Sequence, residues 1–122
     1  VDFTGLVDNV AIARYCAAAD LFVLPSLLEA LPTVAVEALA CGTPVVSSDN
    51  PGGLELNGVF GPDVSIVPGE QPIALGKSIA HFLQHKRRTL PGTREVIERE
   101  FRPAAVAAQY WEIYREAAAP RG

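Results

Sequence analysis

The chain has 122 residues, of which 49% are hydrophobic and 20% are charged, so its composition is that of one small globular domain and argues against disorder. The formal net charge of −4 excludes the broad basic surface that binds nucleic acid or an anionic membrane, and no apolar run reaches transmembrane length. The one basic cluster, Lys86-Arg87-Arg88 after His85, is interpreted as a solvated loop or helix end.

Strands and helices are expected to alternate over the first half of the chain. In order, these are a strand, a helix, a strand, a helix and a strand: Val1–Thr4, Asn9–Ala19, Leu21–Leu24, Pro32–Cys41 and Val45–Ser47. The apolar side of the first helix is expected at Val10, Ala13 and Ala17, with Tyr15 beside them. The second strand is a continuous apolar run, which is typical of burial on both faces. The second helix is apolar nearly all round, which also predicts burial.

The second half is expected to be mostly helical. It should form a turn-rich loop, a weak fourth strand and three helices: Asp49–Gly53, Ser65–Val67, Pro72–His85, Arg94–Phe101 and Pro103–Ala119. The last helix carries an apolar stripe at helical spacing, which we interpret as core packing rather than a ligand site: Val106, Ala107, Tyr110, Trp111, Tyr114 and Ala118.

This order of elements predicts the fold class α/β, with a three-layer, Rossmann-like open parallel sheet of about four strands flanked by helices. Ligands of such sheets bind at the carboxyl ends of the strands. Ser26, Glu29 and the loop Asp49–Gly53 all follow predicted strands, so we expect them at that edge.

The most informative segment runs from Ser26 to Gly42 and contains Glu29 and Glu37. Pro32 opens the predicted helix, and free N–H groups at a helix N-terminus suit phosphate. Glu37 is the only charged residue between positions 31 and 42, and a buried carboxylate is costly unless something binds it. The alternatives are that Glu37 reaches water or pairs with Arg14, and that Glu29 is a solvated loop residue.

Cysteine and histidine residues give no sign of a metal site. Cys16 and Cys41 each lie in an alanine-rich helical stretch and are expected to be free, buried thiols rather than a disulfide. His81 and His85 share no ligand cluster with either cysteine. We therefore expect no metal.

Residues along nearly the whole chain fall in the order of a known pattern. They are Phe3-Thr4-Gly5, Tyr15, Ala19-Asp20, Phe22 to Ser26, Glu29, Glu37-Ala38, Ala40 to Gly42, Pro44 to Val46, Gly52-Gly53 and Tyr114. With these residues the chain resembles the C-terminal domain of the retaining, nucleotide-sugar-dependent glycosyltransferases of family 4 (group 1), which have the GT-B fold. A bare pair of glutamates eight residues apart is a weak signal, but here it matches the family's E-x7-E motif inside ADLFVLPS…EALACGTPVV.

The resemblance implies roles for these residues. Glu29, as the catalytic residue, would contact hydroxyls of the donor sugar near the reacting carbon, and Glu37 would bind the ribose hydroxyls. The substrate-binding positions it implies are Ser26, Leu31, Thr33, Val34, Glu37, Gly52 and Gly53. Pro32 departs from the family pattern and removes one backbone donor. The donor would be an NDP-sugar of the UDP or GDP type, with no metal or other cofactor, because basic side chains and the helix dipole neutralise the diphosphate in this fold.

The resemblance also implies what the chain lacks. Residues 1–122 would be a partial C-terminal donor-binding domain, without the acceptor-binding N-terminal domain and without the first strands that carry an arginine and a lysine. No Arg or Lys occurs among residues 15–76, so we expect the chain alone to be inactive. The strand Leu21–Leu24 would have a bare edge, which predicts self-association. The last helix would expose Tyr110, Trp111 or Tyr114.

The function favoured is the donor half of a glycosyltransferase that moves a sugar to an unknown acceptor in polysaccharide or glycolipid synthesis. The parent protein would be cytoplasmic or peripheral at the inner membrane face, with no nucleic-acid partner. Two alternatives stay open: a non-catalytic module that binds a nucleotide sugar or a protein, and a GT-B sugar-nucleotide epimerase. A dinucleotide-binding domain is disfavoured because no G-x-G-x-x-G follows any strand.

Overall fold

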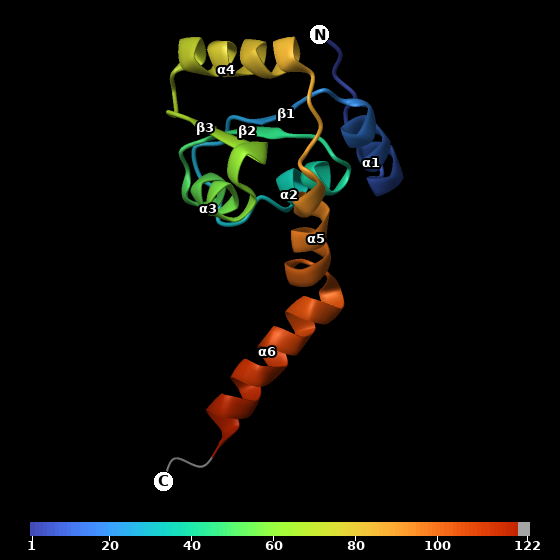
Figure 1. Ribbon diagram of the computed structural model, residues 1–122, viewed down its shortest axis with the longest axis vertical. Helices are drawn as coiled ribbons and strands as arrows, with labels where there is room; N and C mark the ends of the chain where they lie inside the picture. Colours follow the sequence, from blue (N-terminus) through green and yellow to red (C-terminus); the bar gives the residue numbers. More distant parts are fainter. Residues whose placement is uncertain (120–122) are drawn as a thin grey trace.

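A computed structural model describes residues 1–119 as an α/β body with a helical arm (Figure 1). The sheet has three parallel strands in the order β1 (Phe22–Leu24), β2 (Val45–Ser48) and β3 (Val64–Val67). Helix α4 (Pro72–His85) covers one face, and α2 (Thr33–Ala40) and α3 (Pro51–Phe60) cover the other. The predicted three-layer, open parallel α/β fold is therefore confirmed.

The core follows from the alternation of side chains along the strands. Val45 and Val64 point toward α2 and α3 and pack in the larger cluster with Leu39 and Leu56. Val46 and Val67 point the other way and pack in the smaller cluster with Phe82 of α4. Burial of β2 on both faces confirms the prediction for Val45–Ser47.

The other helices are α1 (Asn9–Ala18), α5 (Pro91–Glu100) and α6 (Pro103–Ala118), with a 3-10 turn, η1 (Gly61–Asp63), after α3. Proline stands in the first positions of α3, α4, α5 and α6, where its missing N–H is not needed. The predicted bounds of the helix over Pro72–His85 are confirmed, and those of the other predicted helices are correct to within three residues.

Two element predictions are wrong. Val1–Thr4 forms no strand, so the sheet of residues 1–119 has three strands rather than about four; the segment is exposed, and no neighbouring strand pairs with it. Residues 51–53 are not part of a loop, because α3 begins at Pro51. The Asn50 side chain caps α3 and proline pre-forms its first turn, which outweighs the two glycines.

Helix α1 packs with a different side from the one predicted. Val10 and Tyr15 are 60% and 55% exposed, whereas Cys16 is buried and Ile12 packs beside it. The Thr43 hydroxyl donates to the carbonyl oxygen of Cys16 at 2.5 Å and so holds this side of α1 against the body.

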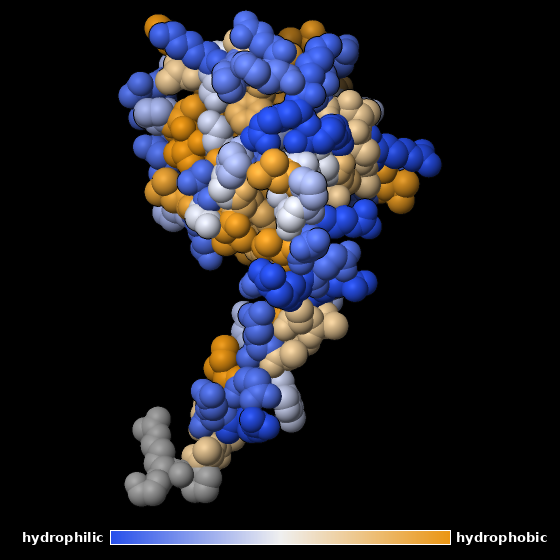
Figure 2. Space-filling model, in the orientation of Figure 1, coloured by the Kyte–Doolittle hydropathy of each residue, from blue (hydrophilic) through white to orange (hydrophobic). Residues whose placement is uncertain are grey.

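Helix α6 is an arm that leaves the body (Figure 1), and none of its residues is buried. The prediction that its aromatic stripe packs in the core is therefore wrong, because the helix extends past the end of the sheet. Exposure of Tyr110, Trp111 and Tyr114 is confirmed. Figure 2 shows apolar residues among hydrophilic ones along the arm as well as on the visible face of the body.

β1 is only half-buried, in contrast to the predicted burial on both faces. It is an edge strand of the sheet, and its outer edge has no partner strand among residues 1–119. An apolar groove of about 340 Å³ lies beside it, lined by Ile12, Tyr15, Phe22 and Val34 among others.

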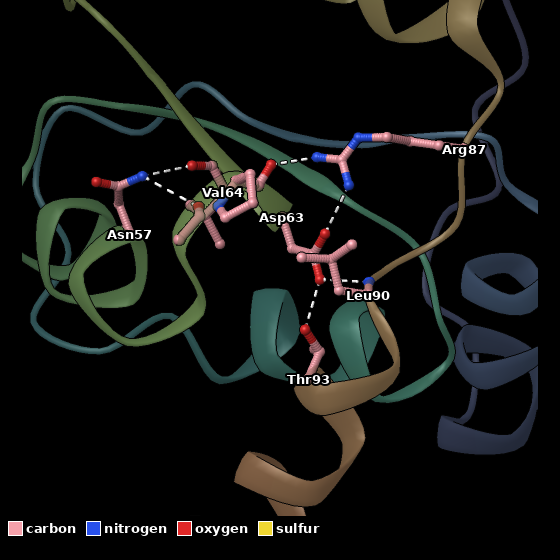
Figure 3. A network of polar contacts seen from close by, with 8 residues as sticks. Asn57, Asp63, Val64, Arg87, Leu90 and Thr93 are labelled. Carbon is pink, nitrogen blue, oxygen red and sulfur yellow. Dashed lines mark hydrogen bonds and ion pairs between the residues drawn. The ribbon is translucent and has the colours of Figure 1, made fainter.

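The buried carboxylate of Asp63 ties α5 to the sheet (Figure 3). It accepts hydrogen bonds from the Arg87 guanidinium at 2.7 Å, the Leu90 N–H at 2.8 Å and the Thr93 hydroxyl at 2.5 Å. Beside it, the Asn57 amide donates to the Val64 carbonyl at 2.6 Å. All of these polar groups are thus satisfied within the chain.

The basic cluster Lys86-Arg87-Arg88 does follow a helix end, as predicted, because Lys86 is the exposed C-cap of α4. Its two arginines, however, are not simply solvated. Besides the Arg87–Asp63 pair, the Arg88 guanidinium donates to the carbonyls of Ala17, Ala19 and Cys41 at 3.2, 2.9 and 2.7 Å. These carbonyls end α1 and α2, so Arg88 closes both helix C-termini. Over residues 1–119, no helix is both long and apolar enough to cross a membrane.

Candidate functional site

The candidate site lies where the chain passes from β1 into α2, at the carboxyl edge of the parallel sheet. Ser26 and Glu29 stand in the connecting loop and are both half-buried. Leu31, 43% exposed, precedes the helix. The sequence-predicted residues Ser26, Glu29, Leu31, Thr33 and Val34 therefore follow one another along a single loop and the first turn of one helix.

Helix α2 buries only one side. Ala35, Ala38 and Leu39 are in the core, whereas Thr33, Glu37 and Ala40 are exposed. Residues four apart share a helix face, so Glu37 lies one turn beyond Thr33, at a rise of about 6 Å along the axis. The prediction that this helix is buried nearly all round is wrong, since the neighbouring elements cover one side of it.

Exposure of Glu37 removes the argument that a buried carboxylate needs a ligand. The ion pairs among residues 1–119 do not include Glu37, and the alternative pairing with Arg14 does not occur. The other alternative, that Glu37 reaches water, holds for the chain without ligand. What remains is a carboxylate on the same open face as the beginning of the helix.

The N-terminus of α2 is open. Its N-cap residue is Pro32, and no side chain caps it. The N–H groups of Ala35 and Val36 reach the Pro32 carbonyl at 2.9 and 3.4 Å. Thr33 and Val34 precede them in the first turn, where a helix supplies no acceptor of its own. The exposed Thr33 and half-buried Val34 thus present backbone donors and the positive end of the helix dipole at the surface.

A turn beneath the loop holds it in place; we call residues Asp49–Gly53 the β2–α3 corner. The Asn50 side chain accepts from the Gly53 N–H at 2.8 Å and donates to the Ser26 carbonyl at 2.9 Å. The Gly52 N–H donates to the Glu29 carbonyl, also at 2.9 Å. The corner therefore fixes the loop at two points, at Ser26 and at Glu29.

The two glycines of the corner allow this close approach. A Cβ atom on Gly52 would lie 2.8 Å from both the Ala30 carbonyl oxygen and Pro32 Cδ. A Cβ atom on Gly53 would lie 2.5 Å from the Ser47 hydroxyl and 2.6 Å from the Ser48 carbonyl oxygen. Both glycines are buried against the chain itself, so their contact with a ligand stays a prediction.

Sequence reasoning missed Asn50, which is 3% exposed and bonded on both sides. The signal that could have found it is an asparagine directly before a proline at the end of a buried strand, which is the pattern of a capped helix start. The two glycines that follow made the segment look like a loop.

Both cysteines are free, as predicted, although Cys41 is only half-buried. Burial raises the pKa of the Cys16 thiol, and the charges of Cys41 and Glu37 raise that pKa further. Within the part of the chain that the structure describes, no three His, Cys, Asp or Glu side chains are placed to hold a metal ion.

Comparison with known proteins gives one consistent picture. The family model described as glycosyl transferases group 1 matches residues 1–100. The D-inositol 3-phosphate glycosyltransferase 2 of Catenulispora acidiphila is 34% identical over 116 residues, which is 93% of this chain and 27% of that protein. The amylovoran biosynthesis glycosyltransferase AmsK of Erwinia amylovora is 32% identical over 124 residues, covering 93% of this chain and 30% of the relative.

A solved structure agrees with these relatives. Sucrose-phosphate synthase from Thermosynechococcus elongatus superposes with a TM-score of 0.83 at 36% identity, over 98% of this chain and 30% of that one. The architecture is that of part of a GT-B domain. The chain spans between a quarter and a third of the length of these proteins.

Proposed function

The chain belongs to the glycosyl transferases of group 1, and from this premise we propose that it is the donor-binding part of a retaining glycosyltransferase. The donor is a nucleoside diphosphate sugar of the UDP or GDP type. The observation that carries this proposal is the open face of α2, on which free backbone donors at Thr33 and Val34 stand one turn from the exposed carboxylate of Glu37.

Each part of that face suits one part of the donor. The N–H groups at the start of α2 and the helix dipole favour the diphosphate without a metal ion. The Glu37 carboxylate can accept two charge-assisted hydrogen bonds from the vicinal hydroxyls of the ribose. Glu29, in the loop before the helix, contacts hydroxyls of the transferred sugar. A nucleotide sugar would thus run along α2 toward the loop.

The relatives differ in the compounds that their names mention. One is named for D-inositol 3-phosphate and another for amylovoran biosynthesis. The donor site is what such enzymes would share, which supports assigning this chain to the donor side. We extend the proposal to a role of the parent protein in polysaccharide or glycolipid synthesis, in the cytoplasm or at the inner membrane face.

Calorimetric titration tests the proposal, with UDP, GDP and their sugar conjugates as ligands. Glu37→Ala should raise the Kd of the preferred nucleotide about 10- to 100-fold, because two hydrogen bonds to a charged group are lost. Glu95→Ala, which removes an exposed glutamate of α5, is the matched control and should leave the Kd unchanged. Equal affinities of both variants and the wild type would contradict the ribose contact.

A sugar-transfer assay of the full-length parent distinguishes an enzyme from a binding module. A module would bind the nucleotide sugar but transfer nothing even in the full-length parent. For the chain alone we expect no transfer in either case, because no arginine or lysine occurs among residues 15–76 to neutralise the diphosphate in the transition state. Transfer of labelled sugar by residues 1–122 alone would contradict this expectation.

The free edge of β1 supports a proposal of self-association. The Phe22 N–H donates to the Pro44 carbonyl of the β2 side, so in a parallel ladder the polar groups of Val23 point away from the sheet. Val23→Pro removes the outward N–H and leaves the ladder to β2 intact. Light scattering should find dimers of the chain and monomers of the variant; monomers of both would contradict the proposal.

A further inference from the structure

We propose that Asn50 is a positioning residue for donor-sugar recognition, acting through the loop that carries Glu29; this rests on the donor-binding function proposed above. Asn50 is 3% exposed, and its side chain lies between the start of α3 and the loop after β1. It lies in the segment Asp49–Gly53 that was expected at the ligand-binding edge, but it is not among the predicted site residues. Its two hydrogen bonds connect the first turn of α3, at Gly53, to the loop that carries Glu29, at Ser26.

The geometry determines how the amide is oriented. The Gly53 N–H can only donate and the Ser26 carbonyl can only accept, so Oδ1 must face Gly53 and Nδ2 must face Ser26. The first bond caps α3, as any good N-cap residue would do. The second bond does nothing for the helix. It holds the loop that leaves β1, over a sequence separation of 24 residues.

Capping brings a second tether into place. With α3 starting at Pro51, the Gly52 N–H falls 2.9 Å from the Glu29 carbonyl oxygen. The space for this contact exists because position 52 lacks a Cβ, which would meet Ala30 and Pro32 at 2.8 Å. Asn50 therefore acts on Glu29 in two ways. Its own bond to Ser26 holds the loop that carries Glu29, and its cap on α3 places the Gly52 N–H that bonds to the Glu29 carbonyl.

The next residue extends the corner to the third strand. The Asp49 carboxylate accepts from the Gly69 N–H at 2.8 Å, and the Asp49 N–H donates to the Val67 carbonyl at 2.9 Å. The loops after β1 and β3 are thus both bonded to the corner after β2. A loop fixed from below in this way keeps the Glu29 backbone in one position, which a sugar-binding carboxylate requires.

Loss of the Asn50 bonds should weaken recognition of the sugar and not of the nucleotide. Displacing the loop moves Glu29, which faces the sugar, but leaves Glu37, which faces the ribose on the rigid helix α2. The affinity for the nucleotide sugar should fall while the affinity for the bare nucleotide stays. The quantity to follow is the ratio of the Kd of the nucleotide sugar to the Kd of the nucleotide, which a general loss of folding stability does not change.

Three variants of the full-length protein that carries this chain separate the cap from the tether. Asn50→Asp keeps an acceptor for the Gly53 N–H but loses the donor to Ser26, and its charge repels that carbonyl. Asn50→Ala loses both bonds. Asn57→Ala is the matched control, since Asn57 is an asparagine within α3, the helix that Asn50 caps, and its amide bonds to Val64, away from the loop.

The Kd of UDP, of GDP and of the sugar conjugate of the preferred nucleotide is measured for each variant, together with its thermal unfolding. We expect Asn50→Asp to raise the Kd ratio about two- to ten-fold, the size of one hydrogen bond, and the thermal unfolding shows separately what the variant costs in stability. Asn57→Ala should lower the stability and leave the ratio unchanged. An unchanged ratio in both Asn50 variants, or an equal change in Asn57→Ala, would overturn the inference.

Glu29→Ala distinguishes a failure of the inference about Asn50 from a failure of the proposed donor-binding function. If it raises the Kd ratio and the Asn50 variants do not, the donor-binding function stands and the positioning role of Asn50 is wrong. If Glu29→Ala itself leaves the ratio unchanged, Glu29 does not bind the sugar, and the proposed function fails at that residue together with the inference.

Discussion

Helices α2 and α3 both begin at the carboxyl edge of the sheet, yet their N-termini are built in opposite ways. At α3 a buried asparagine caps the helix and the N–H groups of Gly52 and Gly53 are both bonded within the chain. At α2 a proline stands at the cap and no side chain closes the first turn. The closed end therefore supports the architecture, while the open end keeps its donors and dipole for a ligand.

The largest loss of stability is expected from a change at Asp63, in the turn that follows α3. Its carboxylate accepts hydrogen bonds from three donors. Asp63→Ala leaves the Arg87 guanidinium, the Leu90 N–H and the Thr93 hydroxyl without their acceptor. We expect a loss of about 3 kcal/mol in the free energy of unfolding, as for other buried pairs that lose one partner. Urea denaturation measures it, and Asp20→Ala at an exposed position should change stability by less than about 0.5 kcal/mol.

The next effect tests the closed N-terminus of α3 itself. Gly53→Ala forces a Cβ to within 2.5 Å of the Ser47 hydroxyl, so it should cost about 1–3 kcal/mol of stability. Gly58→Ala in the same helix meets nothing within 4 Å and should instead stabilise by about 0.5–1 kcal/mol. Two changes of the same kind in one helix should thus have opposite signs; equal effects would show that the corner is not tightly packed.

The fold could be predicted from the sequence where local pattern and burial agree. The strands predicted over Val45–Ser47 and Ser65–Val67 each fall within one residue of β2 and β3, and the amphipathic helix over Pro72–His85 is predicted with its bounds. Val1–Thr4 could not be placed, because a strand exists only with a neighbour to pair with. The start of α3 was missed because Gly52 and Gly53 resemble a turn, although Asn50 and Pro51 before them determine a helix.

The candidate site could be predicted where it depends on residues that are close in sequence, and not where it depends on packing between distant elements. The order of Glu29, Pro32 and Glu37 around a helix start can be read directly from the chain. Which face of α2 is covered cannot, because it depends on α5 and the sheet. The sequence therefore left open whether Glu37 is buried or reaches water, and the structure shows that it is exposed. The tether from Asn50 to Ser26 joins residues 24 positions apart and leaves no local pattern.

A smaller effect tests the open N-terminus of α2. Thr33→Pro removes one backbone donor at the first helical position, where proline is well tolerated, so stability should change by less than about 0.5 kcal/mol. The Kd of the nucleoside diphosphate should rise about tenfold, because a hydrogen bond to a charged group is lost. A nucleoside without phosphate should bind as before. Thr33→Ser keeps the N–H and is the control; equal affinities of the two variants would contradict the phosphate contact.

The smallest effect concerns the core beneath the covered side of α2. Cys16 of α1 is buried there in the same cluster as Ala35, Ala38 and Leu39. Its thiol pKa is raised in the folded chain, chiefly by burial, so the folded state holds the proton more tightly than the unfolded state. Its contribution to stability is complete below the unfolded pKa and is lost as the pH rises above about 8.5. Urea unfolding at several pH values should show a shallower alkaline decline for Cys16→Ala; an equal or steeper decline would contradict this.

Residue-resolved amide hydrogen exchange, measured by NMR with and without the preferred nucleotide, tests the difference between the two helix starts most directly. Without ligand, the amides of Gly52 and Gly53 should be protected by their bonds, while those of Thr33 and Val34 exchange rapidly. With ligand, Thr33 and Val34 should become protected and the two glycines should change little. Protection gained at Gly52 and Gly53 instead, with none at Thr33 and Val34, would contradict the account.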